Sequence, residues 1–289
     1  MPHLLDAEYA LDSSGIHLRR DPVHHREDRY DPRGFQVLRG IQERHFWYAG
    51  RHRFLLGALR DVLGSEHGLP GAPRGVDLGG GCGGWIQYLG KRMPGRFGEL
   101  ALADSSRVAL DLAGPVVGPG VGRYQVDLLD LRWRDRWDVA FLLDVLQLIP
   151  EDLDALGQIR QSLRPGGLLF VTASALRFFW SEYDEANHLA RRYSKADLRG
   201  LAERSGMDLL QSRYYMFFLS PLFLVSRLRQ KLSRLDAAER VVELKRAHEV
   251  PAAPLNLLLR LAFAAETPLG LRLPFPWGTS ILGVLRRPA

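Results

Sequence analysis

The stretch VDLGGGCGGW, residues 76–85, decides the predicted fold. The apolar run from Gly75 to Leu78 is predicted to be a buried strand, and the residues after the glycines are predicted to open a helix. Glycines at such a turn let the backbone bend sharply and come close to a ligand that lies across the strand ends. The stretch therefore predicts a ligand site at the carboxyl edge of a sheet.

Short apolar runs alternate with helical patterns on the C-terminal side of this loop, which is typical of parallel strands joined by crossover helices. The predicted strands are Gly75–Leu78, Leu100–Asp104, Arg123–Val126, Val139–Leu143, Leu168–Ala173, Leu209–Phe217 and Ser280–Leu285. Predicted helices cover Arg51–Gly64, Asp152–Leu163 and Ser194–Gly206. About 60 residues separate the last two strands, too many for a structureless loop, so helices are expected at Asp236–Arg246 and Pro254–Ala265.

Length and composition predict one large α/β domain with an insertion, since the chain has 289 residues and 46% are hydrophobic. The expected parts are an N-terminal extension (1–40) that lacks sustained periodicity and includes mobile or loosely docked backbone, a Rossmann-like core (41–217) with its entry helix, a helical insertion (218–278) and the last strand (279–289). The insertion leaves the sheet at its ligand edge, so we expect an acceptor cap or a homodimer element there. The aromatic residues that lead into it, Tyr214, Tyr215, Phe217, Phe218 and Phe223, fit an apolar acceptor wall, plain core or a dimer face.

Charge and cysteine content narrow the expected partners and location. The net charge of +6 comes from dispersed arginines without a Lys/Arg block, so nucleic acid is not expected as a partner. The apolar run Tyr214–Val225 is shorter than the ~18 residues that span a bilayer, so no transmembrane segment is expected. Cys82 is the only cysteine and no signal-peptide pattern is present, which favours the cytoplasm. The scattered histidines have no metal-ligand spacing, so no metal is expected.

The glycine loop alone leaves two kinds of cofactor open. Gly79, Gly81 and Gly84 fit the GxGxxG loop of dinucleotide-binding enzymes, and an Asp77-led DxGxGxG pattern fits S-adenosylmethionine enzymes. Asp104 ends the second strand, where a carboxylate can accept both hydroxyls of a ribose, which either cofactor contains. The later strands must therefore distinguish the two.

Five motifs in order resemble the class I S-adenosylmethionine-dependent methyltransferases. They cover about residues 75–173 and read VDLGGGCGG, LALADSS, YQVDLLDL, WDVAFLLDVLQLIPED and LRPGGLLFVTAS. Three further segments are similar to a bacterial subgroup of that family: ERHFWYAGRHRFLL, YDEANHLARRYSKADLRGLAERSGM and GTSILGVLRRP. The resemblance implies an α/β fold, the Rossmann-like seven-stranded class I methyltransferase sheet, with the helical insertion between its last two strands.

The resemblance also implies a site for S-adenosylmethionine. Asp77, Gly79 and Gly81 would hold the amino-acid end of the cofactor, and Asp104 would hold its ribose. These roles match the chemistry of a carboxylate and of glycines whose backbone can approach a ligand closely.

Further cofactor contacts are implied on both sides of this loop. Asp127, with the backbone of Leu128, would meet the adenine, because a carboxylate can accept a hydrogen bond from the exocyclic amine of that base. Asp144, at the end of the fourth strand, is also a cofactor-binding candidate. Trp47 and Arg51 match the aromatic and basic N-terminal helix of the subgroup and would cover the cofactor or pair with its carboxylate.

Catalytic candidates follow the fifth strand. His188 has the pKa range of a general base near neutrality, with Asp184 before it and Arg192 and Tyr193 after it. His188, Tyr193 and Asp184 are therefore the catalytic candidates. The alternative interpretation is a polar brace of Asp184, His188 and Arg192 that fixes this loop against the domain.

Three enzymatic functions remain open from the sequence. The leading hypothesis is methylation, at oxygen or nitrogen, of a small molecule such as a natural product or a lipid-linked glycan. Relatives commonly carry Glu-His after the fourth strand, where this chain has Gln147 and Leu148, which favours slightly a cyclisation or pericyclic step on the same cofactor. An NAD-dependent oxidoreductase is supported only by the overlap with the dinucleotide loop.

Overall fold

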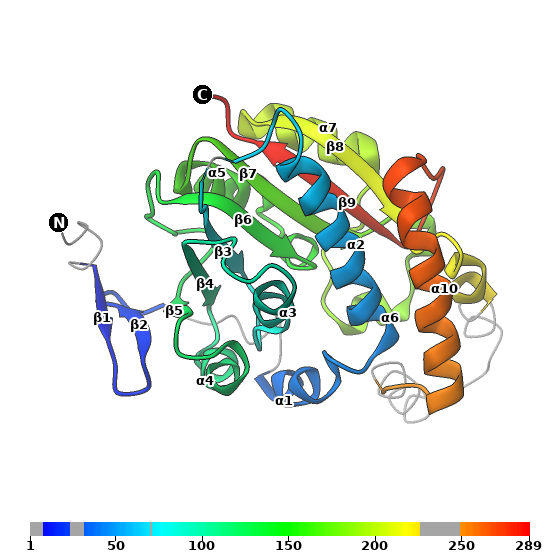
Figure 1. Cartoon of the computed structure of the whole chain (residues 1–289), viewed down its shortest axis with the longest axis horizontal. Helices are drawn as coiled ribbons and strands as arrows, with labels where there is room; N and C mark the ends of the chain where they lie inside the picture. The colour runs from blue at the N-terminus through cyan, green and yellow to red at the C-terminus, as the bar shows by residue number, and fades with distance from the viewer. Residues whose placement is uncertain (1–7, 24–31, 70, 226–248) are drawn as a thin grey trace.

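A mixed β-sheet forms the centre of the computed structural model, which describes residues 8–23, 32–69, 71–225 and 249–289 (Figure 1). Within these residues the sheet has nine strands in the order β1-β2-β5-β4-β3-β6-β7-β9-β8. Their bounds are β1 Tyr9–Leu11, β2 Ile16–Arg19, β3 Arg74–Leu78, β4 Glu99–Asp104, β5 Gly122–Gln125, β6 Trp137–Leu143, β7 Leu163–Ser174, β8 Asp208–Tyr215 and β9 Ser280–Arg286. The five strands β3 to β7 all run parallel to one another. β9 lies between β7 and β8 and runs antiparallel to both.

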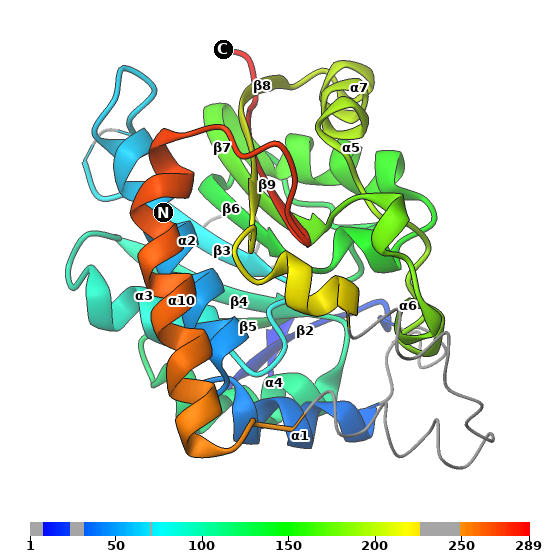
Figure 2. The same cartoon turned by 90° about the vertical axis from the view of Figure 1, so that its right-hand side faces the viewer.

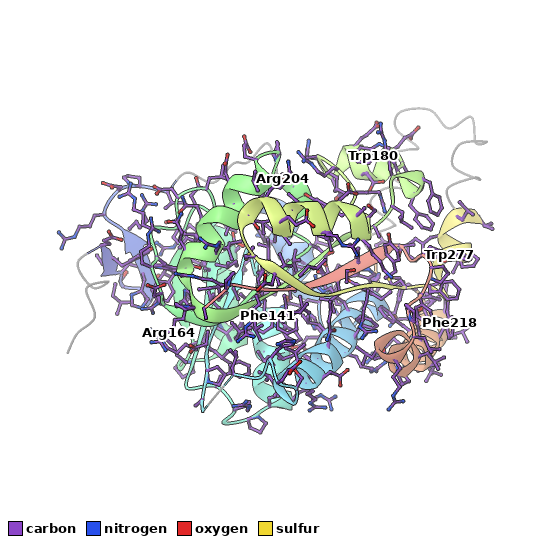
Figure 3. All side chains as sticks on the ribbon, turned by 90° about the horizontal axis from the view of Figure 1, so that it is seen from above. Phe141, Arg164, Trp180, Arg204, Phe218 and Trp277 are labelled. Atoms are coloured by element: carbon purple, nitrogen blue, oxygen red, sulfur yellow. The ribbon has the colours of Figure 1, made fainter. Side chains whose placement is uncertain are left out.

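Helices cover both faces of this sheet (Figure 2). Their bounds are α1 Pro32–Ile41, α2 Phe46–Leu63, α3 Gly84–Arg92, α4 Arg107–Val117, α5 Asp152–Ser162, α6 Glu182–Ala186, α7 Lys195–Ser205 and α10 Ala253–Arg272. Because side chains alternate along a strand, Val139 and Phe141 of β6 pack toward α2, α3 and α10, and Ala140 and Leu142 pack toward α5 and α7. Figure 3 accordingly places Phe141 in the interior of the molecule.

All seven predicted strands are present, and two more precede them. β1 and β2 form an antiparallel pair, and β2 adds to the free edge of β5 with Ile16 opposite Arg123. The expected N-terminal extension, 1–40, thus contains two strands, β1 and β2, and most of α1, none of which was predicted from its sequence. Sequence patterns did not predict β2 because it pairs with a strand more than 100 residues away, and local periodicity does not report such a contact.

Several element boundaries differ from the prediction, and two of them, in β7 and β8, have a clear physical reason. β7 begins at Leu163 rather than Leu168. The predicted turn Pro165–Gly167 lies within β7, where the register between β6 and β7 shifts. β8 ends at Tyr215 because Met216 has a φ of 58°, a conformation that does not continue a strand.

The described part of the insertion contains a helical stretch at residues 220–225 and one long helix, α10. α10 extends the predicted helix Pro254–Ala265 to Arg272 and lies along α2, where Phe263 packs directly on Gly50 (Figure 2). The predicted helix Asp236–Arg246 lies outside the described residues. Among the residues that are described, none of the helices is long and apolar enough to cross a membrane.

Candidate cofactor and acceptor site

A cavity of about 240 Å³ lies at the carboxyl ends of the central strands, beneath α1 and the N-terminal end of α2. All nine residues predicted to bind the cofactor line it: Trp47, Arg51, Asp77, Gly79, Gly81, Asp104, Asp127, Leu128 and Asp144. They come from α2 and from the carboxyl ends of four strands, β3 to β6, with the loops that follow them. The fold therefore gathers residues that are up to 97 positions apart in sequence, Trp47 to Asp144, around one space.

The glycine loop needs its glycines for conformation and for space. Gly79, Gly81 and Gly83 have φ values of 67°, 55° and 77°, which side-chain-bearing residues rarely adopt. A Cβ on Gly79 would stand 2.7 Å from Val145, and a Cβ on Gly83 would stand 2.3 Å from Val117. The loop is fixed to the sheet by the Gly79 amide, which donates to the Ala103 carbonyl at 2.7 Å.

Asp104 links this loop to the end of β4. One carboxylate oxygen accepts from the Gly81 amide at 2.9 Å and the other from the Ser106 amide at 2.8 Å. The side chain is buried and lines the cavity. Since each carboxylate oxygen has a second lone pair, Asp104 still has acceptor capacity for the two hydroxyls of a ribose.

Asp77 is the most unusual carboxylate of the cavity. It is buried at the end of β3, and its Oδ1 has no hydrogen-bond partner. Burial raises its pKa to about 8, with Arg51 acting to lower the value and Asp104 acting to raise it. A buried acceptor without a partner is costly. An ammonium or sulfonium cation in the cavity would relieve that cost, which fits the amino-acid end of S-adenosylmethionine.

Arg51 is held by an ion pair and by two aromatic rings. Its Nη1 lies 2.6 Å from Asp144 Oδ2, and its guanidinium carbon lies 4.8 Å from the Trp47 ring and 5.3 Å from the Tyr48 ring. Asp144 also accepts from the Thr172 hydroxyl at 3.1 Å. The arginine therefore ties α2 to the ends of β6 and β7 and forms a fixed wall of the cavity.

His52 completes this wall. It is buried beside Arg51, and burial together with the neighbouring guanidinium holds the pKa of His52 well below its usual value. A neutral ring nitrogen can accept from Arg51 Nη2, which lies 3.2 Å from His52 Nε2. His52 was not among the predicted site residues, although its place next to Arg51 on α2 was a usable signal.

Asp127 and Leu128 lie at the adenine end that the resemblance implies. Both follow β5 and line the cavity. One Asp127 carboxylate oxygen accepts from the Leu129 amide at 2.9 Å, which fixes the direction of the side chain.

The part of the cavity that sequence reasoning missed is largely apolar. It is built by α1 and by the 3-10 turn Leu146–Leu148 after β6, and its lining residues include Phe35, Leu38, Val145, Leu148 and Ile149. A signal was present, since Phe35, Leu38 and Gln42 recur at helical spacing within the stretch that looked irregular.

The predicted catalytic residues lie outside the lining of this cavity. Asp184 is buried and pairs with Arg192 at 2.7 Å, and it also accepts from the Ser181 amide at 2.7 Å. Tyr193 is buried, donates to Asp152 at 3.0 Å, and has a pKa raised by burial and by that carboxylate. His188 is exposed on the turn between them.

The aromatic residues before the insertion pack into the molecule. Tyr215 stacks between Phe54 of α2 and Phe263 of α10. Phe217 stacks on Phe275, with a ring distance of 4.7 Å. Neither residue lines the cavity, so their observed role is core packing.

A glycine loop, a ribose-type carboxylate after the next strand and a cavity at the carboxyl edge of a Rossmann-like sheet define an enzyme that binds a nucleoside cofactor. The chain belongs to the methyltransferase domain family, whose sequence model matches residues 42–212. It is a class I S-adenosylmethionine-dependent methyltransferase, and the NAD-dependent alternative is not supported by the family. Within the described residues, no group of three His, Cys, Asp or Glu side chains could hold a metal ion.

Solved structures share this fold at low sequence identity. Haemonchus contortus phosphoethanolamine N-methyltransferase 2 with S-adenosyl-L-methionine is 16% identical over 94% of this chain and 62% of that chain, with a TM-score of 0.59. A chain from the Haloferax volcanii complex between the Trm112 methyltransferase activator and a methyltransferase is 18% identical over 91% and 97%, with a TM-score of 0.57. The [4+2]-cyclase SpnF is 18% identical over 81% and 82%, with a TM-score of 0.50. The comparison with curated proteins found no significant match.

Proposed function

We propose that the protein transfers the methyl group of S-adenosylmethionine to the oxygen or nitrogen of a small molecule with an apolar body. The observation that carries this proposal is the division of the cavity into two parts. The charged residues among the nine predicted cofactor contacts line its polar part, and Phe35, Leu38, Leu148 and Ile149 line its apolar part. An apolar wall with few polar groups is typical of a site that binds a small organic molecule.

Positioning is the main contribution of this chain to the reaction. The bound cofactor would supply a methyl group on a sulfonium sulfur, and transfer requires the acceptor atom in line behind the methyl carbon. Asp77 would hold the amino-acid end of the cofactor and Asp104 its ribose, and the ion pair of Arg51 with Asp144 fixes the neighbouring wall. α1 covers the cavity and excludes water from the reacting atoms.

The catalytic candidates then divide by role. Asp184 and Tyr193 act as positioning residues, since both are buried and hydrogen-bonded away from the cavity. They brace the turn that carries His188. This turn touches the acceptor side through the Ala190 amide, which donates to the Gln147 carbonyl at 2.7 Å, next to Leu148 of the cavity. His188 is the general-base candidate for an acceptor that arrives protonated.

Two measurements test the proposal. Calorimetric titration with S-adenosylhomocysteine and with NADH tests the cofactor, and we expect binding of the former only. Incubation with methyl-labelled S-adenosylmethionine and a panel of apolar phenols, carboxylic acids and amines tests the transfer, with mass spectrometry of the product. Labelled product together with S-adenosylhomocysteine supports methylation, and binding of NADH in place of the nucleoside overturns it.

A non-methylating reaction on the same cofactor is the second candidate. The polar pair of the relatives is replaced by Gln147 and Leu148, and Gln147 is engaged with the backbone of Ser174 at 2.7 Å, so it offers no base. SpnF, a cyclase, shares the fold. A product isomeric with the acceptor and free of label would identify this second function.

A further inference from the structure

The exposed side of α10 is apolar where a surface helix would ordinarily be polar. Leu255, Leu257, Leu258 and Leu261 are 50%, 57%, 63% and 58% exposed, while Leu259 and Phe263 of the same helix are buried. A helix that is apolar all round is normally covered on all sides, and clustered exposed apolar residues mark an interaction site. α10 therefore has one covered face, against α2, and one face that offers leucines to a partner.

These leucines lie next to the cover of the cavity. Asn256 of α10 accepts from the Phe46 amide at 2.9 Å and donates to the Arg44 carbonyl at 2.9 Å, which fastens the start of α10 to the start of α2. Figures 1 and 2 both show α1 and the N-terminal end of α10 at the same lower end of the molecule. We call this surface the α1–α10 face and define it by Val37, Arg39, Arg44, Leu255, Leu257, Leu258, Arg260 and Leu261.

The charge of this face is positive. The face contains three arginines, Arg39, Arg44 and Arg260, and the single carboxylate within α1 and α10, Glu266, is buried. Of the exposed carboxylates beside the face, Glu43 lies 4.0 Å from Lys91, and Glu249 precedes α10. The whole chain carries a net charge of +6.

We propose that the α1–α10 face docks on an anionic lipid surface. Leucines beside arginines match the acyl boundary and the charged headgroups of such a surface. A second copy of the chain fits less well, because a two-fold contact would set the arginines of the two copies against each other and neither helix has an exposed carboxylate to pair with them.

Docking in this way would place the cavity cover on the lipid. Val37, half-exposed on α1, faces away from the cavity, whereas Phe35 and Leu38 of the same helix line it. An apolar acceptor could then pass from the lipid to the cavity along α1. The passage of an acceptor rests on the proposed function, but the docking itself does not.

Vesicle co-sedimentation of the full chain tests the docking without any acceptor. The wild-type protein is expected to bind equimolar phosphatidylglycerol–phosphatidylcholine vesicles at least tenfold more tightly than phosphatidylcholine vesicles, and to lose that preference as salt rises. The double variant Leu255→Ser/Leu258→Ser is expected to bind these vesicles at least about tenfold more weakly than the wild type, because two inserted leucines are lost.

Controls separate docking from folding and from self-association. Leu273→Ser removes a leucine that is 53% exposed directly after the far end of α10, and it should leave vesicle binding unchanged. All variants should bind S-adenosylhomocysteine in solution as the wild type does. Failure of the wild type to bind anionic vesicles, equal binding by the double variant, or a wild-type dimer that the double variant abolishes would each overturn the proposal.

Discussion

The Asp77→Asn variant is predicted to remove most of the pH dependence of cofactor binding near neutrality. Asp77 is buried in the cavity with an unpartnered Oδ1 and a pKa raised to about 8 by burial. A cation bound beside it favours the ionised carboxylate. Binding of S-adenosylmethionine below about pH 8 must therefore expel a proton from Asp77.

The magnitude follows from the ionised fraction of Asp77. With a pKa of about 8, about 1% of this carboxyl is ionised at about pH 6, about 9% at about pH 7 and about half at about pH 8. The affinity of the wild type should therefore rise about 50-fold between about pH 6 and about pH 8 and level off above that range. An asparagine carries no such proton, so the variant keeps only the pH dependence of the ligand.

Isothermal titration calorimetry measures both quantities. At about pH 7, titrations in two buffers of different ionisation enthalpy should report about 0.9 proton more released by the wild type than by Asp77→Asn. Equal pH slopes or equal proton release in the two proteins would refute the role of Asp77.

The same pKa has a consequence for the cofactor-free protein. A carboxyl whose folded-state pKa exceeds its unfolded value contributes stability that is present below about pH 4 and is lost as pH rises through about 8. The free energy of unfolding of the wild type should therefore fall relative to that of Asp77→Asn as pH rises across this window. Urea denaturation at several pH values measures the difference.

Three further substitutions separate cofactor binding, bracing and catalysis. Asp104→Ala should weaken S-adenosylhomocysteine binding at least tenfold by calorimetry, because charge-assisted hydrogen bonds to the ribose are lost, whereas the exposed Asp154→Ala should bind normally. Asp184→Ala leaves Arg192 buried without its partner, so urea denaturation should show a loss of about 3 kcal/mol or more with little change in cofactor affinity. His188→Ala should leave stability and binding intact and lower turnover, and unchanged turnover would restrict this turn to a bracing role.

The sequence predicted the site well where the chemistry is local. The glycine loop and the carboxylates after successive strands are set by short segments, and parallel strands bring their carboxyl ends to one edge. Asp77, Asp104 and Asp127 therefore share one cavity, as expected from their place in the pattern. Arg51 was located by resemblance, but its ion pair with Asp144 depends on how α2 crosses the sheet, which no local pattern reports.

Among the described residues, the cover of the cavity comes from a segment that was not predicted to supply it. The 218–278 insertion was expected to cap the acceptor site, yet α10 lies along α2, and the residues that close the cavity include Phe35, Leu38 and Gln42 of the N-terminal region. The insertion does leave the sheet at the carboxyl edge, because Tyr215 pairs with Ser280 and Ser280 pairs with Ser174 at the end of β7. No sequence pattern predicts that Gly50 leaves room on α2 for the Phe263 ring. Because of this contact, α10 packs beside α2 and not over the cavity.

This placement changes where acceptor specificity should be sought. The apolar part of the cavity is shared between α1 and the turn after β6, so a substitution in Leu38 or Leu148 changes the shape of the space directly. No residue of α10 lines the cavity, and Asn256 and Phe263 fasten this helix to α2. The exposed side of α10 is apolar and basic, so substitutions there should change docking on a lipid surface. Substitutions in Leu38 or Leu148 should change acceptor recognition, and the two properties can therefore be altered separately.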